Sequence, residues 1–112
     1  MANPAFYFGN NSGDCFMTHD EIKRPLGVFS RMNNCDFNLT FRIKSFSMSL
    51  YSRGKWIEST TDGPSFTEKQ KDDLYKLHSD DRIIFHHIMV KGQGGIDTTI
   101  TRTIPGMFVT VQ

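Results

Sequence analysis

Apolar and polar residues alternate along residues 37–50, the longest patterned stretch of the chain. The first apolar positions are Phe37, Leu39, Phe41 and Ile43, and the polar residues between and after them are Asn38, Thr40, Arg42 and Lys44. Successive side chains of a strand point to opposite faces, so this pattern predicts a strand with one apolar face. Past Lys44 the apolar set shifts by one position, to Phe46, Met48 and Leu50. We therefore predict a β-bulge near Lys44–Ser45 in a long, bent central strand.

Shorter segments with strand-like patterns lie on either side of this stretch. A reversal at Ser52–Lys55, where Gly54 permits a tight turn, should lead into a returning strand that begins at Trp56 and Ile57. Residues 82–90 carry apolar side chains at both odd and even positions, which predicts a strand buried at least partly on both faces. The other predicted strands are Ala5–Phe8, Gly27–Met32, Thr98–Ile104 and Met107–Val111.

Two segments have the spacing of a helix capping box. Thr18 and Glu21 predict a short helical turn that Pro25 ends, and Thr67 and Gln70 predict a helix of about ten residues. The apolar stripe of the second helix is narrow, so packing on a sheet must hold it. Ser59–Ser65 reads as a loop by composition, and residues 92–95 read as a turn. Seven to nine strands with two short helical inserts predict an all-β, immunoglobulin-like β-sandwich that forms one domain over residues 1–112.

Composition and charge exclude several classes of function. The chain has 13 Lys and Arg residues against 12 Asp and Glu residues, a net charge of +1, without the basic face that nucleic acid binding needs. No apolar run is long enough to cross a bilayer, and the N-terminus lacks the regions of a signal peptide. Taken alone, these features predict a cytosolic protein or a piece cut from a longer one, with no membrane contact of its own.

The residues that often carry chemistry do not form a recognisable site. His86 and His87 are neighbours on a predicted strand, so we expect them to point to opposite faces and not to share a metal ion. His19 and His78 lie beside predicted helix ends, where solvated histidines are common. Residues 92–95 lack the pattern of a phosphate-binding loop, and the paired carboxylates Asp72–Asp73 and Asp80–Asp81 fit solvated positions. The sequence predicts no enzyme activity, no catalytic residues, no metal and no cofactor.

Two cysteines, Cys15 and Cys35, have the number needed for one disulfide in an oxidising compartment. The alternative is that each is a small buried or half-buried side chain. Spacing alone does not decide between them, because bridging depends on the distance between the two Cα atoms. We expect both cysteines to contribute little to stability.

Three segments resemble the C-terminal domain of GldM, also called PorM, from the gliding-motility and type IX secretion machinery of Bacteroidetes. They are Met32–Phe46, Ser65–Gln70 with Leu74–Leu77, and Asp81–Gly92. The order and spacing of the segments carry the resemblance. Cys35 departs from it, standing where an aromatic residue is usual in that family.

The resemblance implies a non-enzymatic structural domain with protein partners. It implies the periplasmic, membrane-distal end of a homodimeric, inner-membrane-anchored protein that docks onto a ring of outer-membrane-associated lipoproteins and contacts associated secretion and gliding proteins. The alternative is a ligand- or carbohydrate-binding β-sandwich module of the cell envelope.

The C-terminal strand is the best sequence candidate for an interface. It follows Pro105, which cannot donate to a strand ladder, and no return strand follows it. We expect a sheet edge there, open to a second copy or to a partner, or at the adjoining Thr98–Thr103 strand. The candidate interface residues are Met107, Phe108, Val109, Thr110 and Val111.

Overall fold

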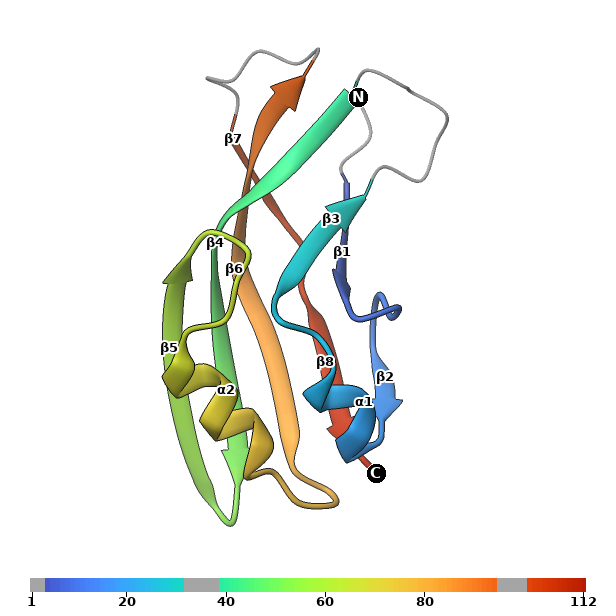
Figure 1. Cartoon of the computed structure of the whole chain (residues 1–112), viewed down its shortest axis with the longest axis vertical. Coiled ribbons are helices and arrows are strands. Elements are labelled where there is room, and N and C mark those ends of the chain that lie inside the picture. Colours follow the sequence, from blue (N-terminus) through green and yellow to red (C-terminus); the bar gives the residue numbers. More distant parts are fainter. Residues whose placement is uncertain (1–3, 32–38, 95–100) are drawn as a thin grey trace.

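The computed structural model describes residues 4–31, 39–94 and 101–112 (Figure 1). In chain order the elements are β1 (Ala5–Phe8), β2 (Cys15–Met17), α1 (His19–Lys23), β3 (Val28–Arg31), β4 (Leu39–Ser52), β5 (Lys55–Asp62), α2 (Glu68–Tyr75), β6 (Arg82–Gly94), β7 (Thr101–Ile104) and β8 (Met107–Val111). Strands dominate, as the sequence predicts, and both predicted helices are present.

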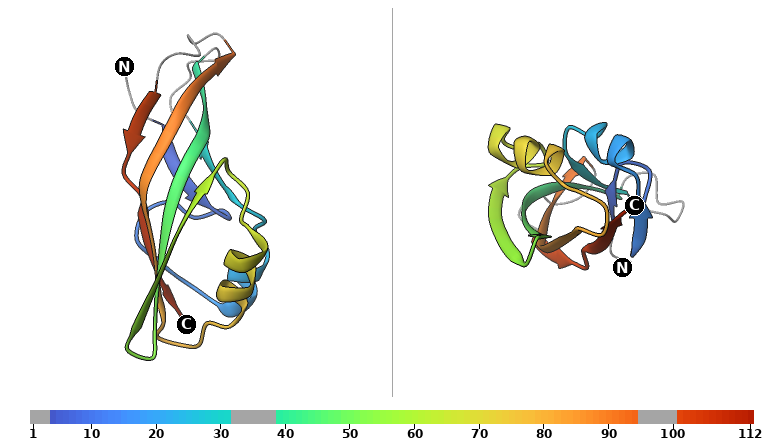
Figure 2. Two further views of the ribbon diagram at one scale, coloured as in Figure 1. Left: turned by 90° about the vertical axis from the view of Figure 1, so that its left-hand side faces the viewer. Right: turned by 90° about the horizontal axis from the view of Figure 1, so that it is seen from below.

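The elements form two layers. A six-stranded sheet runs in the order β2-β8-β6-β4-β5, with β7 paired to the other half of β6. All its pairs are antiparallel except the parallel pair of β2 and β8. The antiparallel pair β1–β3 and both helices lie together on the concave side of this sheet (Figure 2). The arrangement is sandwich-like, which confirms the predicted fold class.

The long strands β4 and β6 pair at the centre of the sheet, and each contains one bulge. The residue pairs around the bulges are Ile43 with Val90, Ser45 with Met89, and Ser47 with His86. Between the first two pairs β4 has one extra residue, Lys44, and between the last two β6 has one extra residue. The two extra residues are on opposite strands, so their shifts cancel. The pairing register of β4 with β6 is therefore the same on both sides of the two bulges.

The bulge in β4 confirms the prediction near Lys44–Ser45. Phe41 and Ile43 are buried before it, and Phe46, Met48 and Leu50 are buried after it. The odd shift in the apolar pattern is therefore absorbed by the backbone, and Phe41 and Ile43 face the same core as Phe46, Met48 and Leu50. Phe37 lies outside the described residues.

The half-buried Ile84 and Met89 confirm that the second face of β6 is partly buried. Regular alternation would also place Ile88 and Val90 on the face opposite Ile83 and Phe85, and that part of the prediction is wrong. His87 has a φ of 49°, a conformation that turns the strand and marks its bulge. As a result Ile83 and Phe85 before the bulge face the same core as Ile88 and Val90 after it. Apolar residues occur at both odd and even positions of β6 for two reasons. The bulge shifts the core-facing positions by one, and the second face is partly buried.

Phe85 lies at the centre of the core. It is 2% exposed, and four other phenylalanine rings surround it. Their centroids lie 5.3 Å (Phe6), 5.0 Å (Phe8), 6.2 Å (Phe46) and 6.4 Å (Phe66) from its own. These rings come from β1, β4 and the segment before α2, so one β6 side chain joins both layers.

Helix α2 is fixed to the sheet by a polar residue of its own capping box. The Gln70 side chain accepts from the backbone N–H of Thr67 and is 1% exposed. It also accepts from Thr61 Oγ1 at 2.7 Å and donates to Ser59 Oγ at 3.0 Å. Both capping boxes predicted from the sequence are confirmed. The helix, whose apolar stripe is narrow, is held by its contacts with β5, as expected.

Several local boundaries differ from those predicted. The hairpin turn at Arg53–Gly54 is confirmed, with φ of 53° and 78°. Strand β5 continues to Asp62, because β-branched Thr60 and Thr61 extend its pairing with β4 into the predicted loop. Strand β6 likewise continues to Gly94 through the predicted turn. Strand β2 has only three residues and was not predicted.

The prediction that β8 (Met107–Val111) is a sheet edge is wrong. β8 pairs with β6 on one side and with β2 on the other. Its backbone is therefore hydrogen-bonded to both neighbouring strands, and one of its faces, with Met107, Val109 and Val111, is buried in the core. Pairing with β2 could not be foreseen, since it joins the C-terminal strand to a short segment near the other end of the chain.

Phe85→Ala should destabilise the domain by about 3–5 kcal/mol, because it removes a fully buried aromatic ring from the contact between the two layers. Phe16→Ala is the matched control, since Phe16 is 67% exposed. Its effect should stay within about 0.5 kcal/mol. Urea unfolding followed by circular dichroism measures both values, and equal midpoints for the two variants would contradict this account of the core.

Candidate interaction surface

The convex face of the six-stranded sheet is not covered by any described helix or strand (Figure 2). Cross-strand pairing places five residues in one row across this face, because directly paired residues share a face. The row runs from β5 to β2 through Trp56, Tyr51, Arg82, Thr110 and Phe16. At about 4.8 Å per strand spacing, it spans roughly 19 Å.

Aromatic side chains and one arginine dominate this row, and one more aromatic residue, Phe108, lies in the next row. Trp56 is 57% exposed, and its ring centroid lies 4.9 Å from that of Tyr51. The Arg82 guanidinium lies 5.9 Å from the ring centroid of Phe108, which is half-buried in the next row. Tryptophan, tyrosine and arginine are the residues most enriched at the energetic centres of protein interfaces. We name the convex-face residues Trp56, Tyr51, Arg82, Thr110, Phe16 and Phe108 the aromatic face.

The predicted interface residues take part in this face through their side chains. Phe108 and Thr110 point to the aromatic face, whereas Met107, Val109 and Val111 point into the core. For the adjoining prediction, Thr98–Thr103, the structure describes only the part from residue 101 onward. There β7 pairs with β6, and among the described residues no second strand pairs with it.

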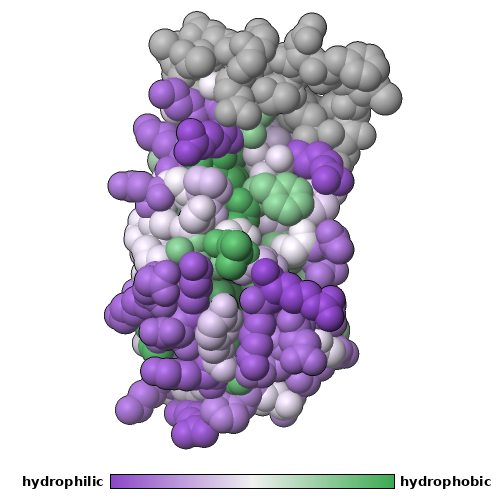
Figure 3. Space-filling model, viewed as in Figure 1, coloured by the Kyte–Doolittle hydropathy of each residue, from purple (hydrophilic) through white to green (hydrophobic). Residues whose placement is uncertain are grey.

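The opposite side of the molecule carries a shallow groove of about 590 Å³. It lies among the β1–β3 layer, α1 and the segment before α2, and its lining includes Met17, Pro25, Leu26, Phe29 and Pro64. Leu26 is 67% exposed there, and apolar side chains lie near the middle of this side, between hydrophilic flanks (Figure 3). The charged residues of the lining, Glu21 and Arg24, are both exposed.

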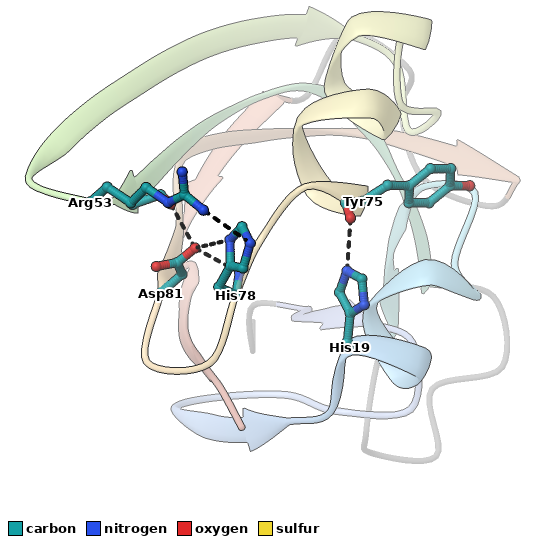
Figure 4. A network of polar contacts seen from close by, with 6 residues as sticks. His19, Arg53, Tyr75, His78 and Asp81 are labelled. Atoms are coloured by element: carbon teal, nitrogen blue, oxygen red, sulfur yellow. Dashed lines mark hydrogen bonds and ion pairs between the residues drawn. The ribbon is translucent and has the colours of Figure 1, made fainter.

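His78 and His19 have structural contacts (Figure 4). The buried carboxylate of Asp81 accepts from the backbone N–H of His78 and from Ser52 Oγ, each at 2.7 Å. His78 Nε2 lies 3.2 Å from the Arg53 guanidinium, and His19 Nε2 lies 2.8 Å from the backbone oxygen of Tyr75. These contacts join the β4–β5 turn to the start of β6, and α1 to the end of α2.

The expectation that His86 and His87 point to opposite faces is wrong. The bulge at His87 turns its ring back toward His86, and the two ring centroids lie 4.7 Å apart. The signal was present in the sequence, because the apolar positions of β6 shift by one there, as they do in β4. Ser49 Oγ lies 2.8 Å from His86 Nε2. Ser49 sits in a strand paired on both sides, so its backbone N–H belongs to the ladder and is not free to stabilise an oxyanion.

Metal binding by three or more groups finds no support in the described part of the chain. No cluster of three His, Cys, Asp or Glu residues with suitable geometry occurs there. No helix among the described residues has both the length and the apolar character needed to span a bilayer.

Cys15 is a half-buried thiol in β2 that packs against the core. Burial raises its pKa above the usual value for cysteine, and the carboxylates of Glu21 and Asp14 raise the pKa further. Cys35 lies outside the described residues, so a bridge between the two cysteines stays untested.

The family model described as the GldM C-terminal domain matches residues 3–112, which is nearly the entire chain. No curated protein matches the chain.

The raised pKa of Cys15 predicts slow alkylation near neutral pH, because only the thiolate reacts. Glu21→Gln should lower this pKa by removing a nearby negative charge, so iodoacetamide should react faster, by up to about tenfold. Glutamine keeps the capping box of α1. The rate is measured by mass spectrometry at pH 7.5 in a Cys35→Ser background, with Glu58→Gln as the control. An unchanged rate in Glu21→Gln would remove the electrostatic part of this explanation.

Proposed function

Because this chain belongs to the GldM C-terminal domain family, we propose that it is a non-enzymatic docking domain of the gliding-motility and type IX secretion machinery. The family is a structural one from an envelope-associated protein. We propose further that the domain acts in the periplasm, at the membrane-distal end of a homodimeric protein, and docks onto the outer-membrane-associated lipoprotein ring.

The aromatic face is the observation that carries this proposal. A sheet face that is left uncovered normally presents polar side chains, because water is its neighbour. Here Trp56 and Phe16 are more than half exposed at the two ends of one row. Arg82 lies between them in the same row, and it too is exposed. This composition supports a contact that becomes dry when a protein partner binds.

The contacts of the titratable and hydroxyl side chains in the described part of the chain favour a docking role over catalysis. The titratable groups with several partners, such as Asp81 and His78, hold chain segments together. Ser49, which contacts His86, lies in a strand paired on both sides, so its own backbone N–H belongs to the sheet ladder. A docking domain needs none of these groups to react, whereas a hydrolase would need them converging on a cleft.

We also propose that residues 1–112 act as one folding unit. Phe6 and Phe8 near one end of the chain share the core with Val109 and Val111 near the other. Backbone contacts support the same view, since β2 pairs with β8 and Gln112 donates to the Met17 carbonyl at 2.9 Å.

The alternative function, binding of a small ligand or carbohydrate, has one observation in its favour. The groove beside Leu26 and Phe29 is open and apolar, with charged residues at its margin. The two functions use opposite sides of the molecule, so substitutions on each side distinguish them.

Trp56→Ala should weaken binding to the purified ring lipoproteins of the same organism by about thirtyfold or more, which corresponds to the 2 kcal/mol of an interface hot spot. Arg82→Glu should weaken it as well, because it removes the guanidinium and reverses a charge at the centre of the row. Surface plasmon resonance measures the affinities, and circular dichroism confirms that each variant is folded.

The matched control is Lys69→Glu, an exposed charge reversal on α2 that should leave the affinity unchanged. Leu26→Ala tests the groove. If Leu26→Ala alone abolishes binding and Trp56→Ala binds like the wild type, the docking surface is the groove and the assignment to the aromatic face is wrong. Retention of the domain on polysaccharide, lost in Leu26→Ala, would favour the alternative function.

A further inference from the structure

Strand β5 (Lys55–Asp62) is an open edge of the six-stranded sheet (Figure 1). It pairs with β4 on one side, and among the described strands none pairs with it on the other. With eight residues it is also the longest of the described edge strands, since β1, β2, β3 and β7 have three or four residues each. An open edge of this length offers a row of unpaired backbone groups to an extended segment of another chain.

The hydrogen-bond pattern shows which backbone groups of β5 are available for such pairing. The N–H of Gly63, directly after the end of β5, donates to the carbonyl of Lys44 in β4 at 2.6 Å. In an antiparallel pair, residues that bond to the neighbouring strand alternate with residues whose N–H and C=O point the other way. Counting back from Gly63, the residues whose backbone groups point away from β4 are Trp56, Glu58, Thr60 and Asp62. No other described segment forms a backbone hydrogen bond with these four residues.

Strand β5 lacks the usual structural protection of a long edge. It contains no proline, and its register with β4 has no shift that would mark a bulge. Proline, bulges and short length are common ways in which edge strands avoid pairing with other chains. In addition, Trp56 is 57% exposed on the convex face, and its neighbour Ile57 is 41% exposed on the other face. A strand added along this edge would cover apolar surface on both faces of the sheet.

Two carboxylates on β5 determine what kind of strand fits this edge. Glu58 and Asp62 are exposed and lie on the same face as Trp56, because alternate residues of a strand share a face. The residues paired with them in β4 are Ser49 and Ser45, which carry no charge. Neither carboxylate forms an ion pair with a residue that the structure describes. The open edge therefore presents two uncompensated negative charges on its convex face.

The same two charges disfavour pairing of β5 with the β5 strand of a second copy. In a regular antiparallel pair, only residues with outward-pointing backbone groups bond to each other. A two-fold axis at Glu58 would place this residue opposite its own copy, and an axis at Thr60 would place it opposite the second copy's Asp62. An axis at Ser59 would leave Glu58 diagonal to both of these carboxylates. Each register therefore brings like charges together, which destabilises the pair.

We propose that β5 is a docking edge for an extended segment of a partner protein that carries two Lys or Arg residues four positions apart. The partner segment bonds to the outward backbone groups of β5, and its basic side chains lie opposite Glu58 and Asp62. Opposite charges paired across neighbouring strands stabilise a sheet, so these carboxylates select a basic strand and reject a second copy of β5. This contact is separate from the aromatic face and does not depend on the identity of the partner proposed for that face.

The probe for this proposal is the peptide Lys-Val-Thr-Val-Lys-Val-Tyr with blocked ends, designed to pair antiparallel with residues 56–62. Its lysines then lie opposite Asp62 and Glu58, and its tyrosine lies opposite Trp56. The peptide is titrated into the isotopically labelled full chain at neutral pH and low ionic strength, and binding is followed by nuclear magnetic resonance. The amide signals of the four outward residues should shift in a saturable way, because these N–H groups gain hydrogen bonds. A peptide with Glu in place of both lysines should bind at least about tenfold more weakly.

Variants of the chain separate the backbone contribution from the charges. Thr60→Pro removes an outward N–H that β4 does not use, so it should weaken peptide binding by about tenfold while the domain stays folded. The double change Glu58→Lys with Asp62→Lys should weaken binding at least as much, because it repels the lysines of the peptide. The matched control, Asp14→Lys with Asp20→Lys, changes the net charge equally at exposed positions before β2 and in α1, and should bind like the wild type. Circular dichroism confirms that each variant is folded.

The outcomes decide both the surface and its occupant. Saturable shifts at the four outward amides that are lost in Thr60→Pro and in the Glu58/Asp62 double variant, but kept in the control, support the docking edge. Equal binding by the wild type and Thr60→Pro, or no saturable shifts in the wild type, overturns it. Sedimentation of the wild type tests the other occupant: self-association that Thr60→Pro abolishes would show that β5 pairs with a second copy, and would overturn the choice of a basic partner. None of these variants changes a residue of the aromatic face, so this result is independent of the docking proposal for that face.

Discussion

The period of two along a β-strand is the constraint on which this structure depends. Each extra residue in a strand turns every following side chain to the other face. Strands β4 and β6 each contain one such residue, at Lys44 and at His87, and the two bulges offset each other. Since the register recovers, both strands keep their fully buried apolar residues on the concave side, from Phe41 to Leu50 in β4 and from Ile83 to Val90 in β6. The phenylalanine cluster around Phe85, and the layer of β1, β3 and the helices that packs on it, all depend on this arrangement.

The same constraint separates the core from the surface on which we place the function. With the concave side filled, the convex side is left to residues that alternate with the core: Tyr51 beside Leu50, Arg82 beside Ile83, and Phe108 beside Val109. Substitutions there can change binding without opening the core. The bulge of β6 also brings the rings of His86 and His87 together, so one local irregularity determines both the packing of the core and the contact between these two side chains.

Much of this fold follows from local patterns. The β4 bulge, both capping boxes and the Arg53–Gly54 turn each depend on residues within a few positions of one another, and the structure confirms them. The bulge in β6 has the same signal, but apolar residues at odd and even positions also fit burial on two faces. The position of β8 inside the sheet and the row from Trp56 to Phe16 depend on which strands become neighbours. Strand neighbours are determined by the packing of the whole chain. The pattern of a three-residue strand such as β2 is too short to predict which strand it pairs with.

The offset bulges can be observed directly by nuclear Overhauser spectroscopy on the labelled chain. The account predicts cross-peaks between the ring protons of His86 and His87, together with backbone cross-peaks between Ser45 and Met89 across the two central strands. A regular ladder would instead pair Lys44 with Met89 and Phe46 with His87, and would separate the two rings onto opposite faces. Cross-peaks for those two pairs, without contacts between the histidine rings, would contradict the account.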